Sequence, residues 1–263
     1  MKLPKINVLI TMFNTEKYIK ACIQSLIDQS YKNWEAIIID DKSTDKSIKI
    51  IKNNFRDKRI KITKLKKNIG RLKAINLGLS KCRADYVAIL DADDIAAPER
   101  FKKQINTFKN KKHIKLLASW CNFIDENNNE IGPYRPPEKT NLEMKKVLSF
   151  FNPISFSTVM FSLKYAKKIK SIPYDLEYGF DYMFYLKFIQ HSFNSIYIIP
   201  EYLGSSRISV NSLTYSAANR HLIIKDDLNC LEYAFKNFNL SYLQKVKYFI
   251  FKLKYKIKLL SIR

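Results

Sequence analysis

The sequence predicts an α/β domain in which a mainly parallel central sheet is flanked by helices, with a helical, basic extension at the C-terminus. Short runs of β-branched residues alternate with segments of helical periodicity through the first half of the chain. The runs are apolar throughout, as expected of strands buried on both faces of a parallel sheet. Polar or acidic residues follow three of them, where parallel sheets gather their functional groups.

The elements of the first half follow from this alternation. Strands are expected over 6–11, 35–39, 59–63 and 86–90. Helices are expected to begin at Asn14 or Thr15, at Ser43 or Thr44, and at Arg71, the last one running to Lys81. Pro98 suits the first turn of another helix, whose apolar face carries Phe101, Ile105 and Phe108.

The pattern loosens after Trp120. Segment 125–140 is rich in turn residues and predicts a surface loop. A helix is expected over 181–191, a strand over 195–199, and helical structure from Ala217 to the end. The chain is therefore expected to divide into 1–121 and 122–215, as two halves of one domain, and the extension 216–263.

Composition narrows the class of protein. The chain has 263 residues, 46% of them hydrophobic, which suits one large α/β domain. Its five glycines argue against phosphate loops built on repeated glycine, and no G-x-G-x-x-G follows the first strand, which argues against nicotinamide chemistry. The four scattered cysteines have no metal-ligand spacing and no secretory signal precedes them, so free thiols in the cytosol are expected.

The formal net charge of +23 suggests a polyanionic partner, unless the lysines only reflect genome composition. Nucleic acid, an anionic membrane surface and an acidic polymer would all fit. The sequence has no helix-turn-helix, RRM, KH or zinc-finger signature, so no nucleic-acid partner is expected. No apolar run is long enough to span a bilayer.

The segment 91–94 (DADD), directly after the fourth strand, is the most informative in the chain. Three carboxylates crowded at one strand end repel each other, and a divalent cation would relieve that repulsion. Oxygen ligands favour Mg²⁺ or Mn²⁺ over zinc, and such ions keep positions open for substrate phosphates. The alternative is an acidic helix N-terminus, where Asp is also favoured. The position in register with Asp40 and Asp41 favours the metal.

Four segments occur in a specific order and spacing: VLITMFNTEKYI, IIIDDKSTDKS, NIGRLKAINLGL and DYVAILDADD. Together they resemble the family 2 glycosyltransferases with the GT-A fold. The resemblance is strong over the first half and continues more weakly to about Thr214. It implies a GT-A (Rossmann-like) fold in which 1–121 binds the nucleotide sugar, 122–215 binds the acceptor and 216–263 is an appended helical segment.

The resemblance implies roles for residues at the strand ends. The loop that meets the nucleotide would contain Thr11, Phe13, Asn14 and Glu16. Asp41, with Asp40, would contact the uracil. From the residues alone, this pair can also form a turn with an Asx cap before the helix near Thr44.

The acidic segment also receives roles from the resemblance. Asp93 would be the principal metal ligand, and Asp91 would lie near the ribose and the metal. Ala92 and Asp94 would lie at the donor site, with Asp94 next to the donor sugar.

A catalytic base is implied as well. In the family an acidic pair precedes a DxxLxxR-like helix, and its Asp removes the acceptor proton. Asp181 occupies that place here, and Phe180 replaces the first acid. The alternative is that Asp181 only caps its helix, although both roles can hold.

Two more positions depart from the family pattern. Ile75 precedes Asn76 where the family often has Arg, and Arg71 or Lys73 could supply the missing charge. Ser209 stands where the family often has the His of Arg-x-His, which puts metal affinity in question. Arg207 remains to contact phosphate.

The resemblance therefore implies a metal-dependent, inverting hexosyl- or N-acetylhexosaminyltransferase that uses a UDP-sugar. Its acceptor would be a hydroxyl of a glycan or lipid-linked glycan in bacterial surface polysaccharide or lipo-oligosaccharide synthesis. Asp181 would take the proton of the attacking hydroxyl, while the metal stabilises the leaving UDP. Two alternatives stay open: a non-catalytic nucleotide-sugar or glycan-binding protein of the same fold, and a basic nucleic-acid-binding protein.

Segment 241–263 predicts an interfacial membrane helix. It contains basic residues and no acidic one, and its apolar residues recur at helical spacing: Leu243, Val246, Phe249, Ile250, Leu253 and Ile257. Tyr248, Phe251 and Tyr255 are expected to widen this apolar stripe. Docking on an anionic membrane would place the protein in the cytoplasm, peripheral on the inner face of the cytoplasmic membrane. The alternative is that the stripe packs on the protein's own core.

Overall fold

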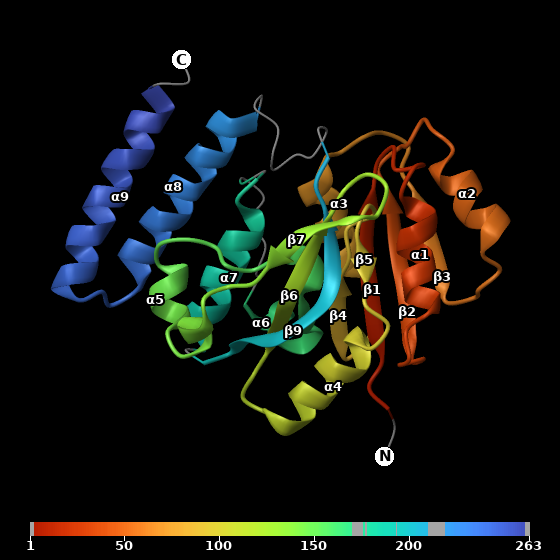
Figure 1. Ribbon diagram of the computed structural model, residues 1–263, viewed down its shortest axis with the longest axis horizontal. Helices are drawn as coiled ribbons and strands as arrows, with labels where there is room; N and C mark the ends of the chain where they lie inside the picture. The colour runs from red at the N-terminus through yellow and green to blue at the C-terminus, as the bar shows by residue number, and fades with distance from the viewer. Residues whose placement is uncertain (1–2, 170–175, 177, 193, 210–218, 261–263) are drawn as a thin grey trace.

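The computed structural model describes residues 3–169, 176, 178–192, 194–209 and 219–260. Strands and helices alternate through the first half (Figure 1). They are β1 (Ile6–Met12), α1 (Ile19–Ile27), β2 (Trp34–Asp40), α2 (Ser47–Asn54), β3 (Ile60–Lys64), α3 (Arg71–Lys81) and β4 (Tyr86–Ile89).

The second half mixes short strands with helices. It contains β5 (Ile95–Ala96), α4 (Arg100–Asn110), β6 (Leu116–Ile124), β7 (Glu130–Tyr134), α5 (Met144–Leu148), β8 (Met160–Ser162), α6 (Leu163–Lys168), α7 (Phe180–His191), β9 (Ile196–Arg207), α8 (Arg220–Asn237) and α9 (Tyr242–Leu260). Two 3₁₀ turns, η1 (Glu138–Asn141) and η2 (Phe156–Thr158), lie among them.

The strands form one mixed sheet in the order β3-β2-β1-β4-β8-β6-β9-β5, with β7 paired to β6. Strands β3, β2, β1 and β4 are parallel, and so are β6 and β9. Because β8 is antiparallel to both β4 and β6, the two parallel groups point the same way. The carboxyl ends of β1, β2, β4, β6 and β9 therefore share one edge of the sheet, where ligands bind in α/β folds.

Helices cover both faces of the sheet. On one face, Val8 and Ile10 of β1 are buried with residues of α1 and α4. On the other, Leu9 is buried with residues of α3 and α7, since successive side chains of a strand point to opposite faces. At Gly78 of α3 a Cβ atom would lie 2.2 Å from Leu9 Cδ1, so any larger residue there would require the Leu9 side chain to move.

The strands predicted in the first half are confirmed to within a residue or two, as are the helix over 71–81 and the Pro98-led helix that carries Phe101. The predicted starts of the first two helices were wrong. Helix α1 begins at Ile19 and α2 at Ser47, several residues later than expected. The reason is that Asn14 adopts a left-handed conformation (φ 52°) and bonds to the other loop instead of capping its own helix.

The prediction of a surface loop over 125–140 was wrong in part. Strand β7 folds back on β6 as a hairpin, with Asn128 in the left-handed conformation (φ 71°) between them. Strand β9 extends to Arg207, beyond the predicted 195–199, because it pairs with β6 and then with the short β5. Strands of two or three residues, such as β5 and β8, carry too short a pattern to be recognised in the sequence.

The helical C-terminus is confirmed over the described residues as a hairpin of α8 and α9, which lies at the opposite end of the molecule from α2 (Figure 1). The exposed fraction of the stripe residues ranges from 41% at Val246 to 78% at Leu243. Tyr248, predicted to widen the stripe, is instead buried and stacks on Phe235 at 4.1 Å between ring centroids. The alternative in which the stripe packs on the core is therefore wrong. No helix among the described residues combines the length and apolarity needed to cross a bilayer.

The division into parts stays a prediction. Its first boundary, after residue 121, falls inside β6, which pairs with β8 and β9 in the same sheet. The second boundary at 215/216, the expected helix start at Ala217, the limit of the resemblance near Thr214, and Arg263 lie outside the described residues.

Candidate active site

The acidic segment lies in the turn after β4, at the shared edge of the sheet. The backbone amide of Asp91 donates to Ser157 Oγ at 2.9 Å, which ties the turn to η2. Both carboxylate oxygens of Asp91 accept from Arg71 Nη2, at 2.7 and 2.9 Å. Arg71 is the first residue of α3, so the β4 turn and the start of α3 are held together by an ion pair.

Asp94 is buried and faces the end of β9. Its Oδ1 accepts from the backbone amide of Arg207 at 2.7 Å, and its Oδ2 from Ser206 Oγ at 3.3 Å. Burial, followed by the nearby Asp93 and Asp91 carboxylates, raises the pKa of Asp94 well above its ordinary value. Asp94 thus fixes β9 against the acidic turn.

Arg207 closes this side of the site. Its Nε donates to the Asp93 carbonyl at 2.8 Å and its Nη2 to Asn128 Oδ1 at 2.7 Å, while Nη1 donates to the Asp125 carbonyl. The guanidinium lies over the Tyr18 ring, 4.4 Å from its centroid. One buried cation therefore joins the β4 turn, the β6–β7 hairpin and the segment before α1.

The Asp93 carboxylate differs from its neighbours, because no other side chain of the described residues donates a hydrogen bond to it. Burial and the Asp91 carboxylate raise its pKa. Such an under-satisfied carboxylate fits a divalent cation, with Asp91 as a second oxygen ligand. Within the described residues, no three acidic, His or Cys side chains are grouped closely enough to hold a metal ion by themselves. Ala92, which separates Asp91 from Asp93 in the sequence, is buried in the same turn.

Asp181 lies in the first turn of α7. Its Oδ2 accepts from Asn152 Nδ2 at 3.1 Å, and its Oδ1 from the backbone amide of Tyr182 at 2.7 Å. Burial, with a smaller contribution from the Asp91 charge, raises the pKa of Asp181 to about 6, against the opposing effects of that amide and of Arg71. A carboxylate poised near neutral pH, close enough to Arg71 and Asp91 to sense their charges, has the properties of a general base.

The Asn14 and Glu16 side chains join two loops at the shared sheet edge. Asn14 Oδ1 accepts from the backbone amide of Thr44 at 2.8 Å, and the Asn14 amide donates to Ser43 Oγ at 3.0 Å. Glu16 Oε2 accepts from the backbone amide of Lys46 at 2.8 Å. The loops after β1 and β2 are therefore held together on the side where the resemblance expects the nucleotide.

Asp40 and Asp41 are buried and hold backbone. Asp41 accepts from the amides of Ile69 and Gly70, at 2.7 and 2.9 Å, and so shapes the loop before α3. Asp40 accepts from the amide of Ser43 at 3.2 Å, which is the turn proposed as the alternative for this pair. Their contact with uracil stays a prediction.

The comparison with known families decides between the classes considered. The family described as Glycosyl transferase family 2 matches residues 7–168. This stretch includes β1, the acidic turn and η2.

The chain belongs to glycosyltransferase family 2.

Relatives extend the match over most of this glycosyltransferase. The uncharacterised glycosyltransferase MJ1057 of Methanocaldococcus jannaschii is 36% identical over 79% of the chain and 72% of its own length. The amylovoran biosynthesis glycosyltransferase AmsE of Erwinia amylovora is 30% identical over 59% of each protein.

Solved structures show the same GT-A-like fold. TarS of S. aureus (residues 1–349, in complex with UDP-GlcNAc) superposes with a TM-score of 0.72 at 18% identity, covering 97% of this chain and 73% of that one. The mannosyltransferase PcManGT of Pyrobaculum calidifontis, in complex with GDP-Man and Mn²⁺, has a TM-score of 0.68 at 16% identity, covering 98% and 70%.

Within the part of the chain that the structure describes, four of the predicted site residues form no hydrogen bond with the acidic turn. Thr11 is half-buried at the end of β1, and Phe13 is 49% exposed. Lys73 is exposed on α3, while Asn76 donates to the Leu72 carbonyl within the same helix. Arg71, not Lys73, is thus the cation of α3 that reaches the acidic turn.

Ser209 lies two residues beyond Arg207 and is half-buried, and the three histidines, at 113, 191 and 221, are exposed. These positions add no imidazole to the acidic turn. The metal ligands proposed for this glycosyltransferase are therefore carboxylates.

Sequence reasoning missed three residues that support the site. Asn152 donates to the Asp181 carboxylate, and Ser157 accepts from the Asp91 backbone amide. Neither residue belongs to a sequence pattern that would identify it as part of the site. Asp226 of α8 accepts from the amides of Tyr178 and Gly179, at 2.8 and 3.1 Å, just before α7. Its signal was available, because Asp226 and its neighbour Asp227 form an acidic pair in a basic C-terminal region.

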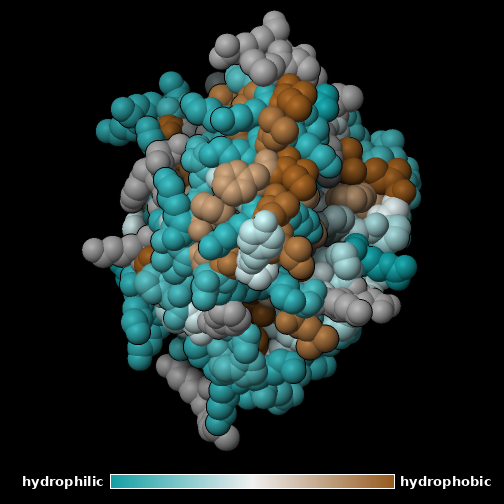
Figure 2. Space-filling view, turned by 90° about the vertical axis from the view of Figure 1, so that its left-hand side faces the viewer, coloured by the Kyte–Doolittle hydropathy of each residue, from teal (hydrophilic) through white to brown (hydrophobic). Residues whose placement is uncertain are grey.

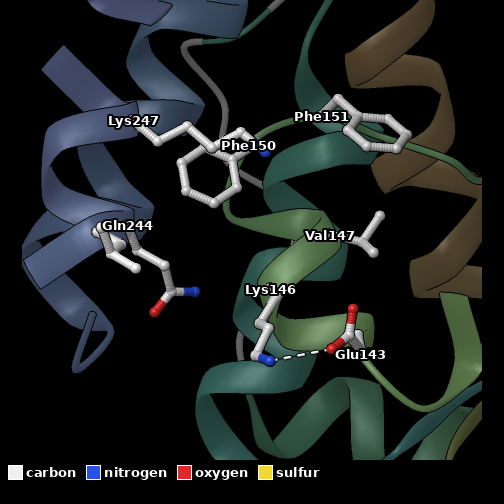
Figure 3. Close-up of a pocket in the computed structure, with 8 residues that line it drawn as sticks. Glu143, Lys146, Val147, Phe150, Phe151, Gln244 and Lys247 are labelled. Atoms are coloured by element: carbon white, nitrogen blue, oxygen red, sulfur yellow. Dashed lines mark hydrogen bonds and ion pairs between the residues drawn. The ribbon is translucent and has the colours of Figure 1, made fainter. Parts of the chain in front are cut away.

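A pocket of about 270 Å³ lies between α5 and α9, outside the acidic site (Figure 3). Val147, Phe150 and Phe151 line one side, and Leu243 and Lys247 the other. None of the predicted site residues contributes to it. The pocket is therefore a feature of the C-terminal surface and not of the donor site.

Proposed function

We propose that this family 2 enzyme transfers a sugar, with inversion, from a UDP-sugar to a hydroxyl of a glycan or lipid-linked glycan, and that it uses Mn²⁺ or Mg²⁺. The observation that carries the proposal is the convergence of Asp181 on the acidic turn. Arg71 bonds to Asp91 and its charge also acts on Asp181. The proposed base and the proposed donor site would then lie side by side.

The donor would lie over the acidic turn. Asp93 and Asp91 would hold the cation, which supplies positive charge for the leaving diphosphate when bound. Arg207, fixed over Tyr18, would place a second cation at the same side. The loops joined by Asn14 and Glu16 would enclose the nucleotide base.

The transfer step needs no covalent enzyme nucleophile. The acceptor oxygen forms a bond to the anomeric carbon as the bond from that carbon to the UDP oxygen breaks. Asp181 takes the hydroxyl proton, and UDP departs with the bonding electrons. Attack opposite the leaving group inverts the anomeric configuration.

The alternative of a non-catalytic binding protein is supported by Phe180, because this residue replaces the first acid of the pair found in the family. The Phe180 ring is buried, packs edge-on against Phe156 at 5.2 Å and lies 5.4 Å from the Arg71 guanidinium. Phe180 thus supports the cation that holds Asp91, while Asp181 remains in place as the base. The substitution is compatible with an active enzyme.

The proposed class of acceptor is based on the names of two relatives. AmsE is named for amylovoran biosynthesis, and a teichoic acid poly(glycerol phosphate) polymerase of Staphylococcus epidermidis is 26% identical over 88% of this chain and 33% of its own length. We therefore place the enzyme in surface polysaccharide synthesis. A lipid-linked acceptor would make it a peripheral protein on the cytoplasmic face of the membrane.

The test is a nucleotide-release screen with UDP-Glc, UDP-Gal, UDP-GlcNAc, UDP-GalNAc, UDP-GlcA and GDP-Man, with and without Mn²⁺. Release from one UDP-sugar that requires metal supports the proposal. Release from GDP-Man alone would replace UDP by GDP, and no release from any donor would favour the non-catalytic alternative.

The metal assignment is tested by calorimetry of UDP binding. We expect tight binding with Mn²⁺ and weak binding with EDTA, because the carboxylates and the diphosphate would then repel each other. Binding should also be weak in Asp93→Ala, because the proposed principal ligand of the cation is lost. Asp28→Ala, an exposed acid at the end of α1, is the matched control and should bind normally. Equal affinity in all samples would remove the metal from the mechanism.

A further inference from the structure

Helix α9 leaves a long apolar face uncovered. The six stripe residues, Leu243 to Ile257, are all exposed, and Phe249 and Leu253 are each 60% exposed. The helix has 19 residues, so this face runs for about 20 Å along its axis. Figure 2, which views this side of the molecule, shows a hydrophobic band bordered by hydrophilic residues. Contiguous apolar surface of this kind marks a binding face.

The opposite face of α9 attaches it to the protein. Tyr248 is buried against Phe235 of α8, and the ring centroids of Phe251 and Phe150 are 5.8 Å apart. Lys252 pairs with Glu232 of α8 at 2.7 Å. The orientation of α9 is therefore fixed by its aromatic face, and the stripe is held outward.

The lysines of α9 border the stripe on both sides. At the helical repeat of 100° per residue, one row contains Lys247, Lys254 and Lys258, and the other contains Lys245, Lys252 and Lys256. The helix contains no acidic residue. Long lysine side chains can extend past an apolar face to reach phosphate groups beside it.

The apolar surface continues past the N-terminal end of α9. Leu243 belongs both to the stripe and to the pocket between α5 and α9 (Figure 3), whose other wall includes Phe151, 43% exposed. Lys247 also lines this pocket, together with Lys146, which pairs with Glu143 at 2.9 Å. The surface thus combines a hydrophobic floor with cations at its margin.

We infer that this surface, the stripe of α9 with its two lysine rows, docks on an anionic lipid bilayer with α9 lying in the plane of the interface. Charge complementarity favours this occupant over a second copy of the chain. Two α9 helices packed stripe to stripe would bring their basic rows together, and neither helix contains an acid to offset them, whereas anionic headgroups neutralise both rows. Docking itself is independent of the donor and of Asp181. Only its purpose, to bring the enzyme to a lipid-linked acceptor, rests on the proposed function.

The test is flotation of the full-length protein with vesicles of phosphatidylcholine alone or with phosphatidylglycerol added. We expect flotation with the anionic vesicles, weakened by salt. Phe249→Asp with Leu253→Asp should reduce partitioning by about 100-fold or more, because two charges would enter the interface. Lys245→Gln, Lys254→Gln and Lys256→Gln together should reduce it on the order of 100-fold, since each lysine contributes about fivefold.

Matched controls separate this surface from general basicity. Lys49→Gln, Lys52→Gln and Lys58→Gln remove the same charge from exposed positions in and just after α2, at the far end of the molecule. Ile131→Asp adds a charge to an equally exposed apolar residue, 57% exposed, in β7. Both controls should float like the unchanged protein, and all variants should keep its unfolding temperature and its UDP affinity.

Three results would overturn the inference. The first is an unchanged protein that stays at the bottom of the gradient, and the second is equal loss of flotation in the α2 control. The third is a dimer by light scattering that Phe249→Asp with Leu253→Asp converts to a monomer, without flotation of either form, which would assign the stripe to a second copy. Loss of nucleotide release with normal flotation would instead contradict the proposed function alone.

Discussion

Phe180 and Arg71 show how one residue changes the chemistry of the site. The aromatic ring takes the place of an acid and lies beside the guanidinium that holds Asp91. An acid at 180 would compete with Asp91 for Arg71 and would add charge next to Asp181. With Phe180 in place, Asp181 is the carboxylate left at the start of α7 for the proposed role of base.

Asp181→Asn should therefore lower the transfer rate by about 100-fold or more, because the amide cannot accept the hydroxyl proton. UDP affinity should stay the same, since the bonds of the acidic turn do not involve residue 181. The measurement is single-turnover transfer beside calorimetric UDP binding. Turnover close to that of the unchanged enzyme would assign the base to another group.

The pH dependence follows from the same residue. Burial raises the pKa of Asp181 to about 6, so the proposed base would be protonated and inactive below that pH. We expect kcat/KM to fall as pH drops through about 6 and to level off above it. Asn152→Ala removes a hydrogen bond that favours the charged form and should move this limb to higher pH. If this limb of the pH profile does not move in Asn152→Ala, the fall in kcat/KM is not caused by protonation of Asp181.

At the scale of elements, the site depends on how α8 holds the start of α7. Asp226 accepts from two successive amides in the turn before Phe180, and a Cβ atom at Gly179 would lie 2.8 Å from Asp226 Cβ. The two segments are thus packed tightly and joined by a buried carboxylate. Asp226 positions Asp181 without reaching the donor site.

Asp226→Ala should reduce kcat roughly tenfold through displacement of Asp181, with little change in UDP affinity. Asp226→Asn keeps an acceptor oxygen for the two amides and should restore most of the rate. Glu232→Gln, on the same helix but partly exposed, is the control and should act normally. If Asp226→Asn is as slow as Asp226→Ala, the acceptor oxygen is not what positions the base.

At the scale of the whole molecule, Arg100 joins the parallel half of the sheet to the antiparallel strand beside it. Its side chain is fully buried and donates to the carbonyls of Ile89, Ser157 and Val159, at 2.9, 2.7 and 3.1 Å. These carbonyls lie at the end of β4 and in the segment that leads into β8. The frame beneath the acidic turn therefore depends on one buried guanidinium.

Arg100→Met should lower the free energy of unfolding by about 3 kcal/mol, because three buried carbonyls each lose a donor. Arg83→Met is the matched control, since the Arg83 guanidinium also donates to backbone carbonyls but is exposed, and its effect should stay within about 0.5 kcal/mol. Urea denaturation of both variants measures the difference. Similar stability of the two would show that β4 and β8 are held by other contacts.

The fold and the site were predictable where local pattern decides. The strands at β1, β2 and β4 are continuous apolar runs, and the acids at 91–94 stand directly after one of them, so their place at the sheet edge followed from the sequence. The loops that begin α1 and α2 were not predictable in this way. Asn14 and Thr44 bond across 30 residues, and no local propensity encodes that contact.

By itself the sequence determined the class of fold, the acidic turn and the basic, amphipathic character of α9, because burial, charge and periodicity are properties of neighbouring residues. Only the tertiary structure decided that Arg71 pairs with Asp91, that Asp226 supports the start of α7, and that β8 joins the two parallel groups. It also decided which face of α9 is free. Both faces of that helix carry large apolar residues, so only the packing of Tyr248 against α8 shows that the aliphatic stripe points outward.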